Sequence, residues 1–127
     1  MQDKHLFEYA VIRIVPRVER EEFLNVGVIL YCAKLNFLQT IFQINEEKLN
    51  AFCSELNITE LTENLQAMER ICAGDTGSGP IGKFATAERF RWLTATRSTV
   101  VQTSKVHPGF SENPKETLEK LYEQLVL

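Results

Sequence analysis

The chain has 127 residues, of which 44% are hydrophobic, and its formal net charge is −3. A chain of this size and apolar content can bury one interior without a metal or disulfide to stabilise it, so we predict one domain over residues 1–127. The sequence has no basic segment followed by an apolar stretch at its start, and it lacks the ~18 consecutive apolar residues of a membrane helix. We therefore expect a cytoplasmic protein with no membrane partner.

The cysteines are three in number, and none of them forms a C-x-x-C pair. An odd number with wide spacing fits neither a disulfide framework nor a zinc site. We expect buried free thiols and no cofactor. The cysteines concerned are Cys32, Cys53 and Cys72.

The first third of the chain predicts three strands. Residues 7–15 are rich in β-branched and aromatic side chains, and Pro16 ends this segment because proline has no N–H for the ladder. Residues 26–33 are apolar on both alternating faces, which predicts an interior strand covered on both sides. Asn36 can adopt the left-handed conformation of a tight reversal. Residues 37–44 then run back, so the last two strands are predicted to form a hairpin.

Helical periodicity follows. Asn45 can cap a helix because its side chain can accept a backbone N–H of the first turn. Asn57 or Thr59 can cap a second helix, which is predicted to end at Gly74. The predicted apolar stripes of these two helices are Leu49, Phe52, Cys53 and Leu56, then Leu61, Leu65, Met68 and Cys72.

Residues 74–82 hold four glycines and a proline, which predicts a flexible loop inside the domain. Thr86 is predicted to cap a short helix that carries Phe90 and Leu93. Residues 98–106 return to β-branched side chains and predict a fourth strand. The His-Pro-Gly sequence at residues 107–109 predicts a turn after it.

The clearest helix signal comes last. Asn113 as cap, Pro114 at the first helical position and Glu116 form a capping box ahead of a leucine-rich stripe. The resulting order of elements is β-β-β-α-α-α-β-α. This order predicts an α+β fold, with a mainly antiparallel sheet of about four strands and helices packed mostly on one face.

Residues 77–83 satisfy the G-x-x-x-x-G-K core of a phosphate-binding loop, but their context argues against one. Phe84 stands where such a loop needs a serine or threonine for magnesium. Pro80 removes a backbone N–H that would contact phosphate, and the preceding segment is predicted to be a helix where the motif needs a strand.

Arginines near the end of the first strand are candidates for anion binding. Arg13 interrupts an otherwise apolar strand, and Arg17 and Arg20 follow it. Guanidinium groups can bind a carboxylate or phosphate through two parallel hydrogen bonds. The alternative is that they form structural ion pairs with the glutamates beside them.

Basic and aromatic residues also alternate between positions 83 and 105, as in proteins that bind single-stranded nucleic acid. Phe90 and Leu93 of this stretch are needed for a buried helix face, and the pI near 5.4 argues against a dedicated nucleic-acid binder. Nucleic acid is therefore not the expected partner.

Catalytic signals are few. His5 and His107 are the only histidines, and no H-E-x-x-H, paired-aspartate or Cys-His spacing is present.

Charge is unevenly distributed, because residues 46–75 hold two basic and seven acidic side chains whereas residues 76–110 hold five basic and one acidic side chain. Such a distribution can orient a partner or attract an anion.

Two stretches carry a family resemblance. The first is YAVIRIVP at residues 9–16, followed by EFLNVGV at residues 22–28, and the second is RWL at 91–93 with RSTVVQ at 97–102. With Pro114 and the leucine-rich last helix, they resemble the bacterial domain of unknown function family 3037. The resemblance implies a small bacterial protein with an accessory role beside a HipA-like kinase, and it brings no activity with it.

Polar residues at strand ends suggest a cluster at one end of the sheet. Some precede the second strand and others introduce or line the last one, so they are predicted to lie close together. They form either a hydrogen-bond network that fixes the loops or a binding site. The candidate cluster is Arg13, Arg17, Glu22, Asn25, Arg97, Ser98 and Gln102.

The leading hypothesis is a non-catalytic protein-interaction or accessory module with a protein partner, and it leaves a homodimer open. The alternative is an anion-, nucleotide- or nucleic-acid-binding or processing domain. That alternative would use Arg13, Arg17 and Arg97, with Glu22 as an acid-base or metal-binding carboxylate.

Overall fold

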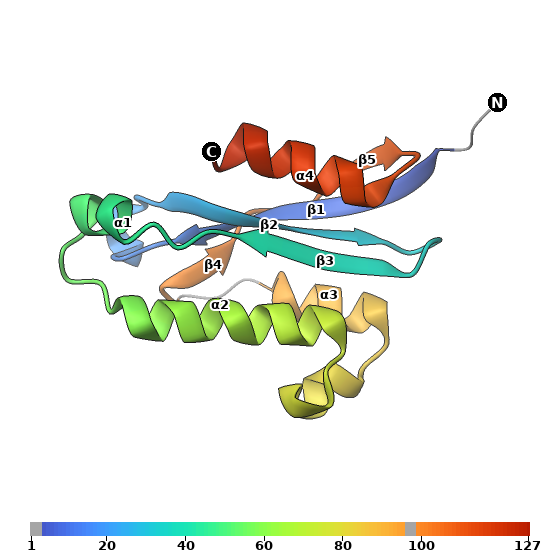
Figure 1. Ribbon diagram of the computed structural model, residues 1–127, viewed down its shortest axis with the longest axis horizontal. Coiled ribbons are helices and arrows are strands. Elements are labelled where there is room, and N and C mark those ends of the chain that lie inside the picture. Colours follow the sequence, from blue (N-terminus) through green and yellow to red (C-terminus); the bar gives the residue numbers. More distant parts are fainter. Residues whose placement is uncertain (1–3, 96–98) are drawn as a thin grey trace.

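The computed structural model describes residues 4–95 and 99–127 and contains a five-stranded antiparallel sheet. The strand order is β3-β2-β1-β4, and β5 also pairs with β1. The first half of β1 therefore pairs with β5 and its second half with β4, so β1 holds the sheet together (Figure 1). The strands are β1 (His5–Ile14), β2 (Leu24–Cys32), β3 (Phe37–Phe42), β4 (Val101–Thr103) and β5 (His107–Ser111).

The predicted hairpin is confirmed, with β2 and β3 joined by a turn in which Asn36 has a φ of 49°. β3 ends at Phe42, before the predicted end at residue 44. The predicted turn at residues 107–109 is wrong, because these residues begin β5 and pair with β1. Pro108 is compatible with this edge strand because its missing N–H need not face a neighbouring strand.

The helices are α1 (Glu46–Phe52), α2 (Ile58–Ala73), α3 (Thr86–Leu93) and α4 (Pro114–Leu125). The caps predicted at Asn45 and Asn113 are confirmed, and the second helix begins after Asn57. Thr86 as a cap is wrong, since Ala85 occupies that position and Thr86 is the first helical residue. The predicted loop at residues 74–82 contains two short 3-10 turns, Thr76–Ser78 and Pro80–Lys83.

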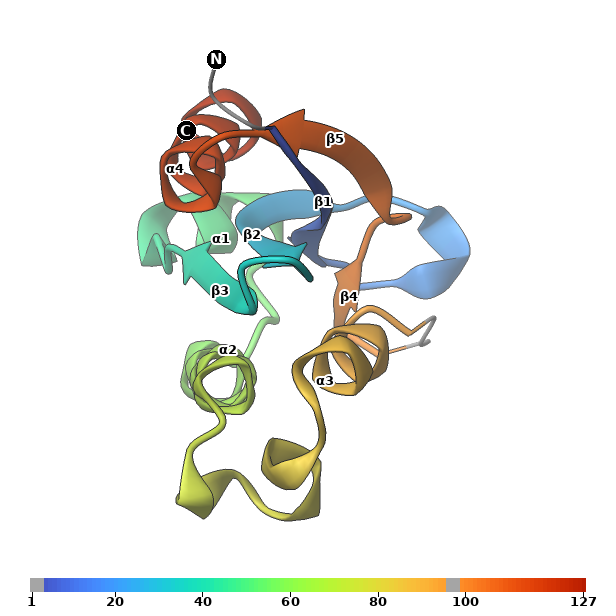
Figure 2. The ribbon, with the colours of Figure 1, turned by 90° about the vertical axis from the view of Figure 1, so that its right-hand side faces the viewer.

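Helices cover both faces of the sheet, with α4 on one side and α2 and α3 on the other (Figures 1 and 2). The larger core lies under α2 and α3 and includes Ile29, Leu65 and Phe90, each fully buried. The smaller core joins Leu30 of β2 to Leu118 of α4. The predicted α+β class with a mainly antiparallel sheet is confirmed. β2 is covered on both faces, as its continuous apolar run predicts.

Within residues 4–95 and 99–127, none of the helices combines the length and apolar content that a membrane span requires.

Candidate functional site

A β-bulge at the start of β2 decides which polar side chains lie together. Ile12 pairs with Gly27, but the next residue, Arg13, pairs with Asn25, so Val26 is an extra residue in β2. The Val26 side chain is buried in the core under α2. Asn25 lies on the opposite face of the sheet, beside Arg13. The bulge therefore keeps a polar amide out of the larger core.

Arg13 has an amide side chain on each side of it in the sheet. Its cross-strand partners are Asn25 in β2 and Gln102 in β4, and directly opposed residues project from the same face. Asn25 Nδ2 donates to the carbonyl oxygen of Leu125 at 3.1 Å, and Gln102 Nε2 donates to that of Thr99 at 2.8 Å. Each amide nitrogen has a second N–H that these bonds do not use.

The guanidinium of Arg13 stacks on an aromatic ring. Its Cζ atom lies 3.9 Å from the centroid of the Phe23 ring, and Phe23 is 45% exposed. Partial burial lowers the pKa of Arg13 below its ordinary value, because the charged form loses hydration. Across the part of the chain that the structure describes, no carboxylate pairs with Arg13, and its buried Nε has no hydrogen-bond partner. Among the described residues, Arg13 is thus a half-buried cation without a counter-anion.

Arg17 and Arg20, which lie at this end among the described residues, are each paired with a glutamate. Arg17 Nη2 lies 3.7 Å from Glu55 Oε2, and Arg20 forms an ion pair with Glu22. These residues line a cleft of about 450 Å³ between the β1–β2 connection and the end of α1. Glu22 is therefore engaged with Arg20 and does not balance the charge of Arg13.

The predicted cluster is divided in the structure. Arg13, Asn25 and Gln102 form one cross-strand row, whereas Arg17 and Glu22 line the adjacent cleft. Arg97 and Ser98 lie outside the described residues. We call the row together with the stacked ring the Arg13 surface, and its members are Arg13, Phe23, Asn25 and Gln102.

Large apolar side chains are exposed at the same end of the molecule. The exposed fractions are 44% for Val18, 38% for Val100 and 71% for Leu127. Leu127 lines a small cavity with Asn25, and the carbonyl oxygen of Val100 accepts a hydrogen bond from the end of β1. Figure 1 shows the β1–β2 connection and the C-terminal end of α4 gathered at this end of the sheet.

Sequence reasoning missed Phe23. The residue precedes β2 and is surrounded by glutamates and a leucine, so no periodicity marks it as a partner of Arg13. Only the register of β1 with β2 brings the two side chains together. The sequence shows only that Phe23 is an aromatic residue outside any predicted apolar stripe. That position does not specify what its ring contacts.

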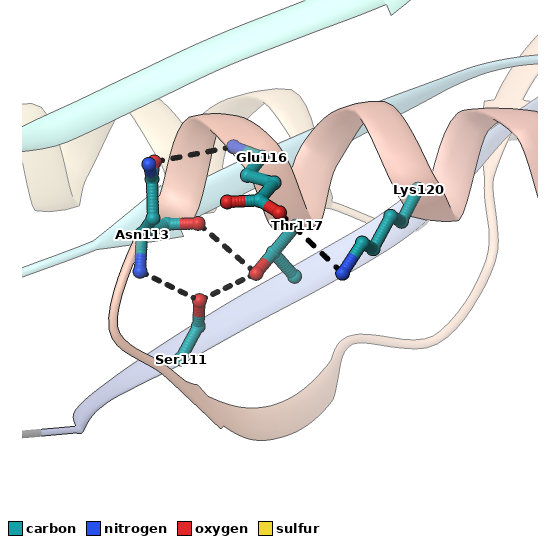
Figure 3. A network of polar contacts seen from close by, with 5 residues as sticks. All are labelled: Ser111, Asn113, Glu116, Thr117 and Lys120. Carbon is teal, nitrogen blue, oxygen red and sulfur yellow. Dashed lines mark hydrogen bonds and ion pairs between the residues drawn. The ribbon is translucent and has the colours of Figure 1, made fainter.

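A second polar network fixes the start of α4 (Figure 3). Asn113 Oδ1 accepts the backbone N–H of Glu116 at 3.2 Å, while the Asn113 N–H donates to Ser111 Oγ at 3.0 Å. Ser111 also shares a hydrogen bond with Thr117, and Glu116 pairs with Lys120 at 3.5 Å. Ser111 of β5 thus occupies the place that a capping box assigns to the glutamate side chain, and the network joins β5 to α4.

The described residues contain no group of three or more histidine, cysteine, aspartate or glutamate side chains that could hold a metal ion. All three cysteines are free, with Cys32 and Cys72 buried and Cys53 half-buried. His107 packs on the Tyr9 ring at a centroid distance of 5.3 Å. The contacts seen around the cysteines and His107 are packing contacts within the fold.

A family model described as "Protein of unknown function (DUF3037)" matches residues 9–126, which is nearly the whole chain. No curated protein and no solved structure matches the chain.

Proposed function

The chain belongs to the DUF3037 family of proteins of unknown function, and we propose that it is a non-catalytic interaction module that docks another protein through the Arg13 surface. The contact between Arg13 and Phe23 is the observation that carries this proposal, because it presents a cation and an aromatic ring together at the surface. Arginine and aromatic residues are enriched in protein interfaces and among the residues that dominate their binding energy. The exposed apolar side chains at the same end supply further contact area.

A protein partner suits this end of the molecule better than a nucleic acid does. Binding to a phosphate backbone depends on several unpaired cations that release counterions. Arg17 and Arg20 are each paired with a glutamate, and the exposed Glu19 and Glu21 lie in the same connection. A polyanion would meet these carboxylates, whereas a protein surface can place a neutral or apolar group beside them.

Quantitative capture of partners from the cells that make the protein tests the proposal. Phe23→Ala removes the exposed ring, and Phe110→Ala is a matched control because Phe110 is 69% exposed on β5, at the other end of β1. We expect a stoichiometric partner that is retained by the wild-type chain and by Phe110→Ala and is lost by Phe23→Ala. Thermal melting of each variant checks that the fold is intact.

Equal capture by Phe23→Ala would contradict the proposal. So would the absence of any stoichiometric partner together with turnover of a substrate by the pure domain. A HipA-like kinase, which the family resemblance implies, is a specific protein to look for among those captured.

A further inference from the structure

Arg13 differs from the neighbouring arginines in what balances its charge. Arg17 and Arg20 have glutamate partners in the adjacent cleft, and Arg91 Nη2 lies 3.9 Å from Glu8 Oε1. Arg89 donates hydrogen bonds to the carbonyl oxygens at the end of α2. Arg13 is half-buried, and no carboxylate pairs with it in residues 4–95 and 99–127. Its charge has therefore lost hydration without a compensating anion.

The groups around Arg13 can complete the coordination of one carboxylate. The side-chain amides of Asn25 and Gln102 flank it in the cross-strand row, and each keeps an N–H that is not used in its bond to a backbone carbonyl. A carboxylate accepts several such donors, and its hydrogen bond with a guanidinium is among the stronger kinds in proteins. Phe23 offers an apolar surface directly beside that position.

We propose that the occupant of the Arg13 surface is a segment of a partner protein with a single acidic residue, in which a glutamate or aspartate carboxylate binds Arg13 and an adjacent apolar side chain covers Phe23. This inference rests on the proposed function and adds the chemistry of the partner to it. A single carboxylate can reach Arg13 between the two amides. A run of phosphates would extend toward Glu19 and Glu21 and be repelled there.

NMR titration of the ¹⁵N-labelled protein tests the inference with two peptides. The probe is acetyl-Leu-Glu-Leu-amide, and the control, acetyl-Leu-Gln-Leu-amide, has the same shape without the charge. We expect the glutamate peptide to shift the Arg13 Nε signal and the side-chain amide signals of Asn25 and Gln102. The apparent Kd of the glutamate peptide should be about tenfold lower than that of the glutamine peptide, because the glutamine peptide lacks the charged hydrogen bond to Arg13.

Two substitutions show where the carboxylate binds. Arg13→Gln should abolish the difference between the peptides, while Arg91→Gln, the same change at an arginine that already has a glutamate partner, should preserve it. Equal binding of the two peptides, absence of shifts at Arg13, or an unchanged difference in Arg13→Gln would each overturn the inference. Shifts at Arg13 with inorganic phosphate or an oligonucleotide, but not with the glutamate peptide, would overturn it in favour of phosphate recognition.

The capture experiment separates this inference from the proposed function. A partner that is lost by Phe23→Ala but retained by Arg13→Gln would support docking at this surface and contradict the role of the carboxylate. A partner retained by both variants would contradict docking at the Arg13 surface altogether.

Discussion

Arg89 Nη1 donates to the carbonyl oxygen of Ile71 at 2.9 Å and thereby ties α3 to the end of α2. The same nitrogen lies 3.2 Å from the carbonyl oxygen of Cys72, and Nη2 lies 3.2 Å from Thr86 Oγ1. A cation at this position also complements the negative end of the α2 dipole. Basic and aromatic residues alternate in this part of the sequence, but the contacts of Arg89 are internal.

Replacing Arg89 with alanine should lower the free energy of unfolding by about 2 kcal/mol, because charged hydrogen bonds to the last carbonyls of α2 are lost. Arg70→Ala is the control, since Arg70 is exposed in the last turn of the same helix, and its loss should cost under about 1 kcal/mol. Urea unfolding at neutral pH measures both values. Equal effects would show that the hydrogen bonds of Arg89 contribute little.

Gly27 marks a close approach between β2 and β3. A Cβ atom there would lie 2.6 Å from the carbonyl oxygen of Ile41 and 2.8 Å from Phe42 Cβ. Gly27→Ala should therefore push β3 away and destabilise the fold by about 1–3 kcal/mol. The control is Gly77→Ala, where the nearest atom to the added Cβ is Asp75 Oδ1 at 3.7 Å, and it should stay within about 0.5 kcal/mol of wild type. Thermal and urea unfolding of the two variants test the difference.

The cap of α4 gives a third prediction. Asn113→Ala should cost about 1 kcal/mol of stability, because the N–H of Glu116 loses its acceptor. Glu116→Ala should cost no more than about 0.5 kcal/mol, since its side chain contributes only an exposed ion pair with Lys120. A true capping box would make the two losses similar in urea unfolding. Ser111→Ala should resemble Asn113→Ala, because Ser111 accepts the Asn113 N–H.

The buried thiol of Cys72 predicts a loss of stability at alkaline pH. Burial raises its pKa to about 12, outweighing the opposite effect of Arg89. The same thiol ionises near pH 8.5 in the unfolded chain, so above that pH the unfolded state binds fewer protons than the folded state. The contribution is fully present below about pH 8.5 and is lost as the pH rises, by roughly 1 kcal/mol per unit between about pH 9 and 10.

Cys72→Ala isolates this effect, because it removes the titrating group while keeping a small apolar side chain. Urea unfolding at several pH values below 10 should give a shallower decline for the variant than for wild type. The upper limit avoids the titration of Tyr122, whose pKa burial also raises. Parallel declines for the two proteins would contradict the assignment to Cys72.

Local hydrogen bonding explains which elements could be predicted from the sequence. The caps at Asn45 and Asn113 each depend on a backbone N–H three residues further along, so the necessary information is contiguous. The strand β5 was missed because Pro108-Gly109 is typical of turns, whereas its pairing with β1 joins segments about a hundred residues apart in the chain. Long-range pairing overrides that local preference.

The candidate site shows the same division. The proximity of Arg13, Asn25 and Gln102 could be anticipated, because each lies near the end of an apolar strand. The pairing of Glu22 with Arg20 could not be anticipated, because that connection holds several glutamates and arginines and their spacing does not favour one pair over another. Strict alternation along β2 also gives no sign that Val26 is an extra residue.

The bulge at Val26 makes the length of this segment as important as its composition. Deleting Val26 would restore simple alternation and would leave Asn25 opposite Arg13 and Leu24 opposite Ile14. If Val26 were kept and β2 paired without the bulge, Asn25 would instead enter the apolar layer beneath α2, while Leu24, which packs against that layer, would turn toward water. A chain that lacks Val26 should consequently keep the Arg13 surface, whereas a chain that retains Val26 depends on the bulge for solubility and partner recognition together.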